Sequence, residues 1–307
     1  MSGEYINDYL SELIEATTEL LENNKCIAVE EQTDLVPLNF GYISSYYYLK
    51  TDTVESFAKK LDSQSKLQHI LEVLCEASEF EAIPIRRKEE SLLKLLNMDV
   101  PYKKQVSKYN DPYTKAFILL QCHFERKTLT ADFAWDQKII LEQALRLIAA
   151  IVDVMSSNGW LKPAILAIQL SQMIVQAMFN DQPSTLQIPY VDFELAEKMK
   201  EKDINDVADF MNMEDDERVS ILGNKANQIE AMANFCNAYP SISMAYEHTV
   251  EEDSVTVNVV LERDNAEEDQ DYQVVAPYYP KQLEEQWWVL IGDTKSNKLH
   301  VIKRVKL

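Results

Sequence analysis

The chain has 307 residues, more than a single domain usually holds, so its length predicts two or three domains. Its formal net charge is -21, from 30 Lys and Arg against 51 Asp and Glu. A surface this acidic repels phosphate, which argues against an autonomous nucleic-acid-binding protein and favours protein partners.

Cysteine spacing and hydropathy predict the cellular environment. Four cysteines, Cys26, Cys75, Cys122 and Cys236, lie far apart without a CxxC pair, which fits a reducing compartment. No charged-then-apolar leader opens the chain, and the longest uncharged run, Pro163 to Asn180, carries glutamines and serines that a bilayer would not accommodate. We therefore expect a soluble intracellular protein without direct membrane contact.

The pattern of residues 1–36 predicts the end of a winged-helix-like element, whose start we expect upstream. Tyr5 to Glu22 carries apolar residues at helical spacing. Cys26 to Val36 then contains two short apolar runs around an acidic turn, which is typical of a β-hairpin.

Residues 37–185 predict a helical bundle. An aromatic helix, Tyr42 to Leu49, opens it, and we expect its tyrosines to pack mainly in the core, although such a cluster can also stack on nucleobases. Thr53 is a candidate N-cap of the following helix. Asn110-Asp111-Pro112 is a start signal for a later bundle helix.

The bundle is organised around Asp136 to Phe179. From Ile139 to Met155 the sequence is apolar almost all round a helix, so other helices have to enclose it. Gly159 suits the left-handed position that ends a helix, and Pro163 fits the first turn of the next one. The two helices are therefore predicted to form an antiparallel pair.

The polar exceptions on the first of these helices form a narrow stripe, Gln143, Arg146, Ala150 and Asp153. A charged pair within an apolar helix needs partners, because an unpaired buried charge is costly. The interpretation we favour is a buried bridge to neighbouring helices. The alternative is that Gln143, Arg146 and Asp153 face a channel.

Residues 186–240 read as short helices joined by acidic turns, which predicts a helix-loop-helix module. Such modules can bind DNA through backbone N–H groups at a helix start. The local excess of acids argues against that use, so packing on the bundle is the expected role.

Residues 241–307 change from helical to alternating periodicity and predict five strands. The expected strands span residues 241–248, 254–264, 272–280, 286–293 and 298–307. This spacing predicts an immunoglobulin-like or fibronectin-like β-sandwich, truncated because the strands are few. The fold class is thus mainly α with a β-sandwich.

Aromatic residues of the β-region are the candidate partner surface, with Tyr278, Tyr279 and Trp287 as its members. Core packing is the competing interpretation. Because neighbours on a strand face opposite sides, at least one of Trp287 and Trp288 should point outward or be covered by another domain.

Motifs for catalysis are absent from the sequence. The chain has 5 Gly, too scattered for a phosphate-binding loop, and its 4 His are isolated. The basic triplet Arg86 to Lys88 precedes two glutamates, so a solvated helix start is favoured over a phosphate contact. We expect no catalytic, cofactor-binding or metal-binding residue, no cofactor, and no enzyme activity of this segment.

The order of these elements resembles the Sec63 homology unit that follows the motor domains of Ski2-like RNA helicases. The resemblance covers almost the whole chain and is most specific to the C-terminal cassette of the spliceosomal members. It is carried by five segments: Pro37 to Phe57, Glu79 to Leu93, Ala144 to Trp160, Phe210 to Leu222, and Trp287 to Leu299.

The resemblance implies a non-catalytic protein-interaction and regulatory unit of a larger ATP-dependent helicase that acts in pre-mRNA splicing and U4/U6 unwinding. The implied partners are splicing-factor proteins and the N-terminal helicase cassette of the same polypeptide, in the nucleus, with weak or absent RNA contact. The alternative is an RNA-channel element of an active cassette, in which a long helix lies beside the RNA as a ratchet. The Gln143, Arg146 and Asp153 stripe would then lie on that helix.

Overall fold

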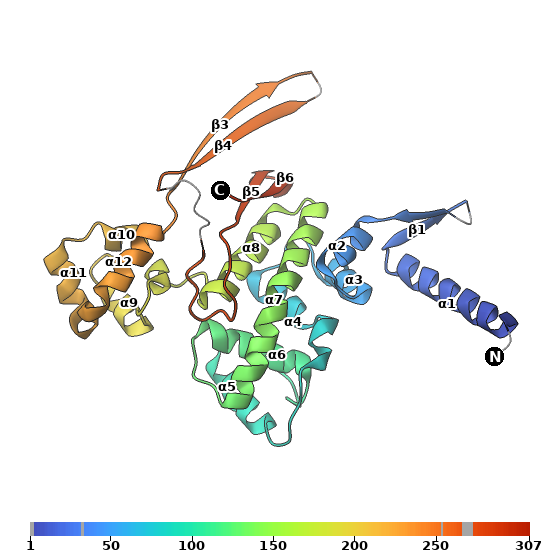
Figure 1. Ribbon diagram of the computed structural model, residues 1–307, viewed down its shortest axis with the longest axis horizontal. Helices are drawn as coiled ribbons and strands as arrows, with labels where there is room; N and C mark the ends of the chain where they lie inside the picture. Colours follow the sequence, from blue (N-terminus) through green and yellow to red (C-terminus); the bar gives the residue numbers. More distant parts are fainter. Residues whose placement is uncertain (1–2, 32–33, 253, 266–272) are drawn as a thin grey trace. The chain divides into compact units, whose positions relative to one another are not determined.

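A computed structural model describes residues 3–31, 34–252, 254–265 and 273–307. The chain forms two compact units. Unit 1 comprises Met1–Asn180 with Leu290–Ile302, and unit 2 comprises Asp181–Val289 with Lys303–Leu307. Most elements are helices, and the strands form small two-stranded sheets (Figure 1).

Unit 1 is mainly helical. Its elements are α1 (Gly3–Asn23), β1 (Ile27–Glu30), β2 (Asp34–Pro37), α2 (Asn39–Tyr47), α3 (Thr51–Lys60), α4 (Leu67–Cys75), the 3-10 helix η1 (Ser78–Ala82), α5 (Glu90–Asp99), α6 (Pro112–Phe124), α7 (Ala131–Ser157) and α8 (Leu161–Gln176).

Helix α7 is the axis of the bundle, as predicted. It packs against α2, α3, α4, α6 and α8, and most of its apolar positions from Ile140 to Met155 are buried. Gly159 takes a φ of 71° after α7 ends, and Pro163 lies in the first turn of α8, which confirms both expectations. Figure 1 shows α7 and α8 lying side by side.

Helix α6 is enclosed even more completely than α7, since every residue from Thr114 to Phe124 is buried. The predicted start signal is confirmed, because the Asp111 side chain accepts a hydrogen bond from the Thr114 backbone N–H at 2.7 Å.

The predicted cap at Thr53 is wrong. Helix α3 starts two residues earlier, at Thr51, with Lys50 as its N-cap, and a glutamate from η1 bonds the start of the helix. Glu79 accepts from the Lys50 N–H at 2.9 Å and from the Thr53 hydroxyl at 2.7 Å. The hydrogen bonds at the start of α3 thus come from a residue distant in sequence, which local pattern could not reveal.

The tyrosines of α2 are less buried than expected. Tyr47 lies in the core, but Tyr42, Tyr46 and Tyr48 are 61%, 73% and 87% exposed. Residues this close along a short helix point in different directions, and of the four side chains only that of Tyr47 is buried, where its hydroxyl bonds Asp153 of α7. The expectation of a mainly buried cluster is therefore wrong for three of its members.

The predicted hairpin near the start is confirmed. Strands β1 and β2 pair antiparallel, with Ala28 opposite Val36. Gly41 packs α2 closely onto this hairpin, because a Cβ at that position would lie 2.3 Å from the Cys26 carbonyl oxygen.

Strands β5 (Trp287–Asp293) and β6 (Lys298–Val305) pair with each other, and the turn between them docks on the start of α8. Asn297, with a φ of 58°, accepts from the Lys162 N–H at 2.7 Å and donates from its amide to the Ser63 carbonyl at 3.2 Å. The Leu299 N–H donates to the Gly159 carbonyl at 2.8 Å. These bonds hold residues 290–302 within unit 1.

Unit 2 contains short helices and a long hairpin. Its further elements are η2 (Ser184–Gln187), α9 (Phe193–Lys200), α10 (Val207–Met211), α11 (Asp215–Leu222), η3 (Gly223–Gln228), α12 (Ile229–Ala238), β3 (Ile242–Val250) and β4 (Val255–Arg263). Asp192 and Asp206 cap α9 and α10, and the helices bury Phe210, Leu222 and Phe235.

The strand predictions are confirmed in part. Strands β3 and β4 pair from Ile242 opposite Arg263 to Val250 opposite Val255. The expected strand over 272–280 is wrong for the described residues 273–280, which form only an isolated bridge at Gln273. Two prolines and a tyrosine pair in that segment favour turns over a continuous ladder.

Candidate functional site

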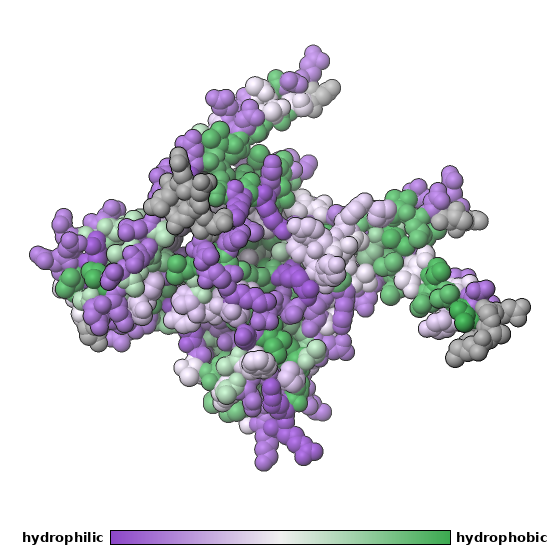
Figure 2. Space-filling model, viewed as in Figure 1, coloured by the Kyte–Doolittle hydropathy of each residue, from purple (hydrophilic) through white to green (hydrophobic). Residues whose placement is uncertain are grey.

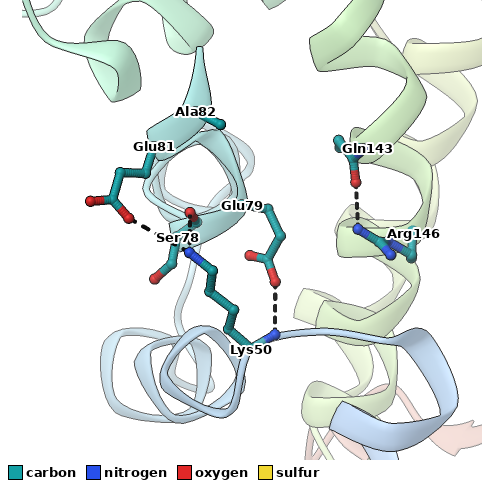
Figure 3. A pocket seen from close by; sticks show the side chains of 7 residues that line it. All are labelled: Lys50, Ser78, Glu79, Glu81, Ala82, Gln143 and Arg146. Carbon is teal, nitrogen blue, oxygen red and sulfur yellow. Dashed lines mark hydrogen bonds and ion pairs between the residues drawn. The ribbon is translucent and has the colours of Figure 1, made fainter.

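A groove that contains part of the predicted stripe lies between α7 and the η1 region of unit 1. It has a volume of about 470 Å³ and is lined by Lys50, Ser78, Glu79, Glu81, Ala82, Gln143 and Arg146. Figure 3 shows Gln143 and Arg146 reaching in from α7, opposite the other five residues. Two of the three stripe residues therefore share one groove.

Both signs of charge line this groove. Lys50 Nζ donates to the Ser78 carbonyl at 3.2 Å and lies 3.6 Å from a Glu81 carboxylate oxygen, while Glu79 holds the start of α3. These carboxylates offset the cations, so the groove is not an anion-binding pocket. It offers hydrogen bonds to a polar chain rather than a charged cradle.

Arg146 and Asp153 both contact the C-terminal end of α2. Arg146 donates to the Tyr48 carbonyl at 3.3 Å and also to the side chain of Gln143. The Tyr47 hydroxyl donates to Asp153 at 2.6 Å. Burial raises the pKa of Asp153 to about 6.

A buried network of charges lies elsewhere in the bundle, and sequence reasoning missed it. Lys115 Nζ is fully buried and lies 2.8 Å from oxygens of both Glu89 and Asp136. It also donates to the Pro84 carbonyl at 2.7 Å, and Arg86 donates to Asp136 at 2.8 Å. Residues 84–89, α6 and α7 are joined through this network.

The electrostatics of the network follow from its pairing. Burial by itself raises the pKa of Asp136, but hydrogen bonds from Arg86 and Lys115 outweigh it and leave that pKa below its usual value. The expected solvated role holds for Arg87 and Lys88, which are exposed, but not for Arg86. A lysine in the first turn of α6, directly before the apolar run Ala116 to Leu120, was the one available signal.

The residues of the predicted partner surface in unit 2 differ in how far their side chains are exposed. Tyr278 is 48% exposed, whereas Tyr279 is buried and 8% exposed. Trp287 is half-buried and donates from its indole N–H to Glu285 at 2.7 Å. Trp288 is also half-buried, with the Arg304 guanidinium 4.3 Å from the centre of its ring.

The adjacent residues Cys122 and His123 lie in buried environments that disfavour their charged forms. Burial raises the pKa of Cys122 to about 12 and lowers that of His123 to about 4, and the His123 ring bonds the Ile174 carbonyl at 2.8 Å. Among the described residues, no group of three or more His, Cys, Asp or Glu is placed to hold a metal ion. The described helices include none long and apolar enough to cross a membrane.

Comparison with protein families gives one match that covers most of the chain. Residues 37–307 match the model of the Sec63 Brl domain. This range includes the groove, the buried charge network and the aromatic residues of unit 2.

Comparison with known proteins gives relatives that align with nearly the whole chain. The chain is 43% identical over 310 residues to the human U5 small nuclear ribonucleoprotein 200 kDa helicase and 41% identical over 312 residues to the protein of the same name from Drosophila melanogaster. It is 42% identical over 315 residues to the DExH-box ATP-dependent RNA helicase DExH12 of Arabidopsis thaliana. Each alignment covers at least 99% of the chain but 14% of the relative's length.

Proposed function

Because the chain belongs to the Sec63 Brl domain family, we propose that it is a non-catalytic protein-interaction and regulatory unit of a larger spliceosomal RNA helicase. The observation that carries this proposal is the alignment of the whole chain with 14% of the U5 small nuclear ribonucleoprotein 200 kDa helicase at 43% identity. The motor that uses ATP would lie in other parts of such a helicase. The unit would then act in pre-mRNA splicing and U4/U6 unwinding, in the nucleus.

The chemistry of the chain supports a docking role over a catalytic one. The charge of -21 and the mixed charges of the groove disfavour strong RNA contact. Its cysteines are buried, and no Gly-rich phosphate loop is present in the sequence. The partners we propose are splicing-factor proteins and the N-terminal helicase cassette of the same polypeptide.

The domain organisation is part of this proposal. We divide the chain into the end of a winged-helix-like element (1–36), a helical bundle (37–185), a helix-loop-helix module (186–240) and an immunoglobulin-like sandwich (241–307). The sandwich is supported by β3 and β4, which place Met244, Tyr246, Val250 and Val255 on one apolar face with exposed fractions of 61–71%. A two-stranded hairpin needs cover for such a face.

The docking role is tested by affinity capture from nuclear extract with the tagged chain. We expect U5 small nuclear ribonucleoprotein proteins to be recovered in the presence of nuclease, because the contacts proposed are between proteins. Tyr278→Ala should reduce this recovery if the aromatic residues form the partner surface, whereas Tyr42→Ala is the matched control in unit 1. Recovery that disappears with nuclease would contradict the proposal.

A second candidate is the RNA-channel element. It is favoured by the groove beside α7 and by Tyr46 and Tyr48, which are 73% and 87% exposed and can stack on bases. The test is fluorescence anisotropy with labelled single-stranded RNA. Binding that Arg146→Ala weakens and Lys59→Ala leaves unchanged would favour this candidate, and no binding at physiological salt would reject it.

A further inference from the structure

Helix α5 exposes three large apolar side chains on one stripe. Leu92, Leu95 and Met98 are 44%, 63% and 65% exposed, and successive members are three residues apart. The opposite face holds the helix on the bundle through the buried residues Leu93 and Asn97. In Figure 2 hydrophobic and hydrophilic surface adjoin in the part of unit 1 where Figure 1 places α5.

The segment around α5 reverses the charge of the chain. Residues 86–108 carry seven Lys and Arg against three Asp and Glu, whereas the whole chain has 30 against 51. Lys94 lies four residues before Met98 and is therefore its neighbour on the helix surface. It is exposed, as are Lys103 and Lys108 in the loop that follows α5.

Hydrogen bonds between side chains of α5 and the loop backbone hold that loop along the helix. The Asn97 amide donates to the Lys104 carbonyl at 3.0 Å, and the Lys104 N–H donates back to Asn97 at 2.9 Å. At the other end of α5, Glu90 accepts from the Tyr109 N–H at 3.2 Å. The loop thus runs antiparallel to α5, which places Lys108 near the start of the helix and Lys103 near its end.

Two acids of this region hold partners of their own, whereas three of its lysines form no ion pair within the described part of the chain. Asp99 pairs with Lys127 at 2.6 Å, and Glu90 holds the loop. Among the described residues, Lys94, Lys103 and Lys108 form no ion pair. Three exposed cations without an ion pair therefore flank the apolar stripe, and the nearby Asp99 carboxylate, which Lys103 also attracts, is shared with Lys127.

We propose that the α5 surface, formed by Leu92, Lys94, Leu95, Met98, Lys103 and Lys108, docks an acidic segment of a partner protein that carries apolar side chains at helical spacing. The apolar side chains would cover the stripe, and the carboxylates would meet the flanking lysines. Single-stranded RNA fits less well, because stacking on bases needs aromatic side chains and those of the stripe are aliphatic or a thioether. A second copy of this chain fits less well because of its net charge.

This inference rests on the proposed docking function. It adds the chemistry of one partner of the docking unit. Its test can fail separately. If the chain recovers U5 proteins from nuclear extract but the α5 surface binds no acidic apolar peptide, only the present inference is overturned.

The probe is a fluorescein-labelled peptide of about 12 residues that repeats Asp-Glu-Leu-Phe and so repeats its apolar pair every fourth residue. We expect saturable binding to the full chain with a Kd on the order of 10 µM at low salt, weakened by added salt. Replacing Leu and Phe of the peptide by Ser should weaken binding at least ~10-fold, because charge alone then remains.

Surface variants locate the binding on α5. Lys94→Glu and the double variant Leu95→Ser with Met98→Ser should each weaken binding at least ~10-fold, which corresponds to a loss of about 1.4 kcal/mol. Lys202→Glu and Met211→Ser change exposed residues of unit 2 in the same way and should leave the Kd unchanged. Circular dichroism and thermal melting check that all variants fold.

Three outcomes would overturn the inference. One is an equal Kd for the α5 variants and the unit 2 controls. Another is a single-stranded RNA that binds tighter than the peptide in a manner sensitive to Lys94→Glu. The last is a concentration-dependent dimer in light scattering that Leu95→Ser with Met98→Ser abolishes, which would assign the surface to a second copy.

Discussion

Lys115 shows how one side chain can join three segments of the bundle. Its ammonium is fully buried and is paired with Glu89 and Asp136, so its removal leaves carboxylates in a dry environment. We predict that Lys115→Met lowers the free energy of unfolding by about 3–5 kcal/mol, although methionine fills the space. Chemical denaturation followed by circular dichroism measures this change.

The matched control is Lys127→Met. Lys127 also pairs with an aspartate, at 2.6 Å, but the Asp99 side chain is 69% exposed. A surface pair of this kind contributes less than about 1 kcal/mol. Equal losses in the two variants would show that burial does not govern the effect.

His123 predicts a loss of stability in acid. Burial lowers its pKa to about 4, below the 6.5 of an unfolded histidine, so the unfolded chain binds the proton first. The free energy of unfolding is therefore retained above pH 6.5 and falls as the pH drops toward 4, by up to about 3 kcal/mol.

The variant that tests this is His123→Gln, which keeps a donor for the Ile174 carbonyl but does not titrate. Denaturation at a series of pH values should show a shallower acid slope for it than for the unmodified chain. His300→Gln changes an exposed histidine and should keep the original slope. A slope unaffected by His123→Gln would rule out this source of acid sensitivity.

Asp153 should give the opposite pH dependence of the free energy of unfolding. Burial raises its pKa to about 6, above the unfolded value of 3.8, so its contribution is present below pH 3.8 and is lost as the pH rises through 6. Asp153→Asn still accepts from Tyr47, and we expect it to raise the free energy of unfolding at pH 8. The gain should be about 1 kcal/mol, because solvent partly screens this half-buried carboxylate.

The control for this variant is Asp181→Asn, which changes an exposed aspartate and should leave the free energy of unfolding unchanged. A loss of stability in Asp153→Asn would contradict the argument.

At the scale of elements, distant residues complete several helix starts. Asn297, in the turn between β5 and β6, bonds the first turn of α8, as Glu79 does for α3. Because Asn297 has a φ of 58°, Asn297→Gly keeps the backbone relaxed and removes the side-chain bonds alone. We predict a loss of about 1–2 kcal/mol and faster amide exchange in residues 298–302.

Ser296→Ala is the comparison for this variant. Ser296 lies in the same turn, but its hydroxyl bonds Asp293 within the turn itself. It should leave exchange in residues 298–302 unchanged. If both variants accelerate exchange equally, the turn and not the contact with α8 holds the strand.

At the scale of the whole molecule, the net charge dominates the long-range electrostatic energy. A charge of -21 repels itself in the folded state, and salt screens that repulsion over about 10 Å at 0.1 M. We predict that the melting temperature rises as NaCl increases from about 20 to 500 mM, since each exposed ion pair that salt weakens contributes little stability. A falling melting temperature in scanning calorimetry would show that attractive pairs outweigh the repulsion.

Features that depend on neighbouring residues follow from the sequence alone. Periodicity located α7 and α8, Asp111 marked the start of α6, and Gly159 marked the turn, because these follow from side-chain direction and backbone freedom within a few residues. The overall order of elements also sufficed to identify the family. Of the candidate site, the sequence located the stripe on α7 but not the residues that face it.

Contacts between groups that are distant in sequence became visible in the folded structure. Lys115 and Glu89 form a buried pair across 26 residues, and Glu79 reaches the start of α3 across 29. The predicted strand at 273–280 was wrong because a strand exists only when another pairs with it. The cost of burying a charge or leaving a ladder unpaired depends on the folded surroundings, so local pattern could not settle these features.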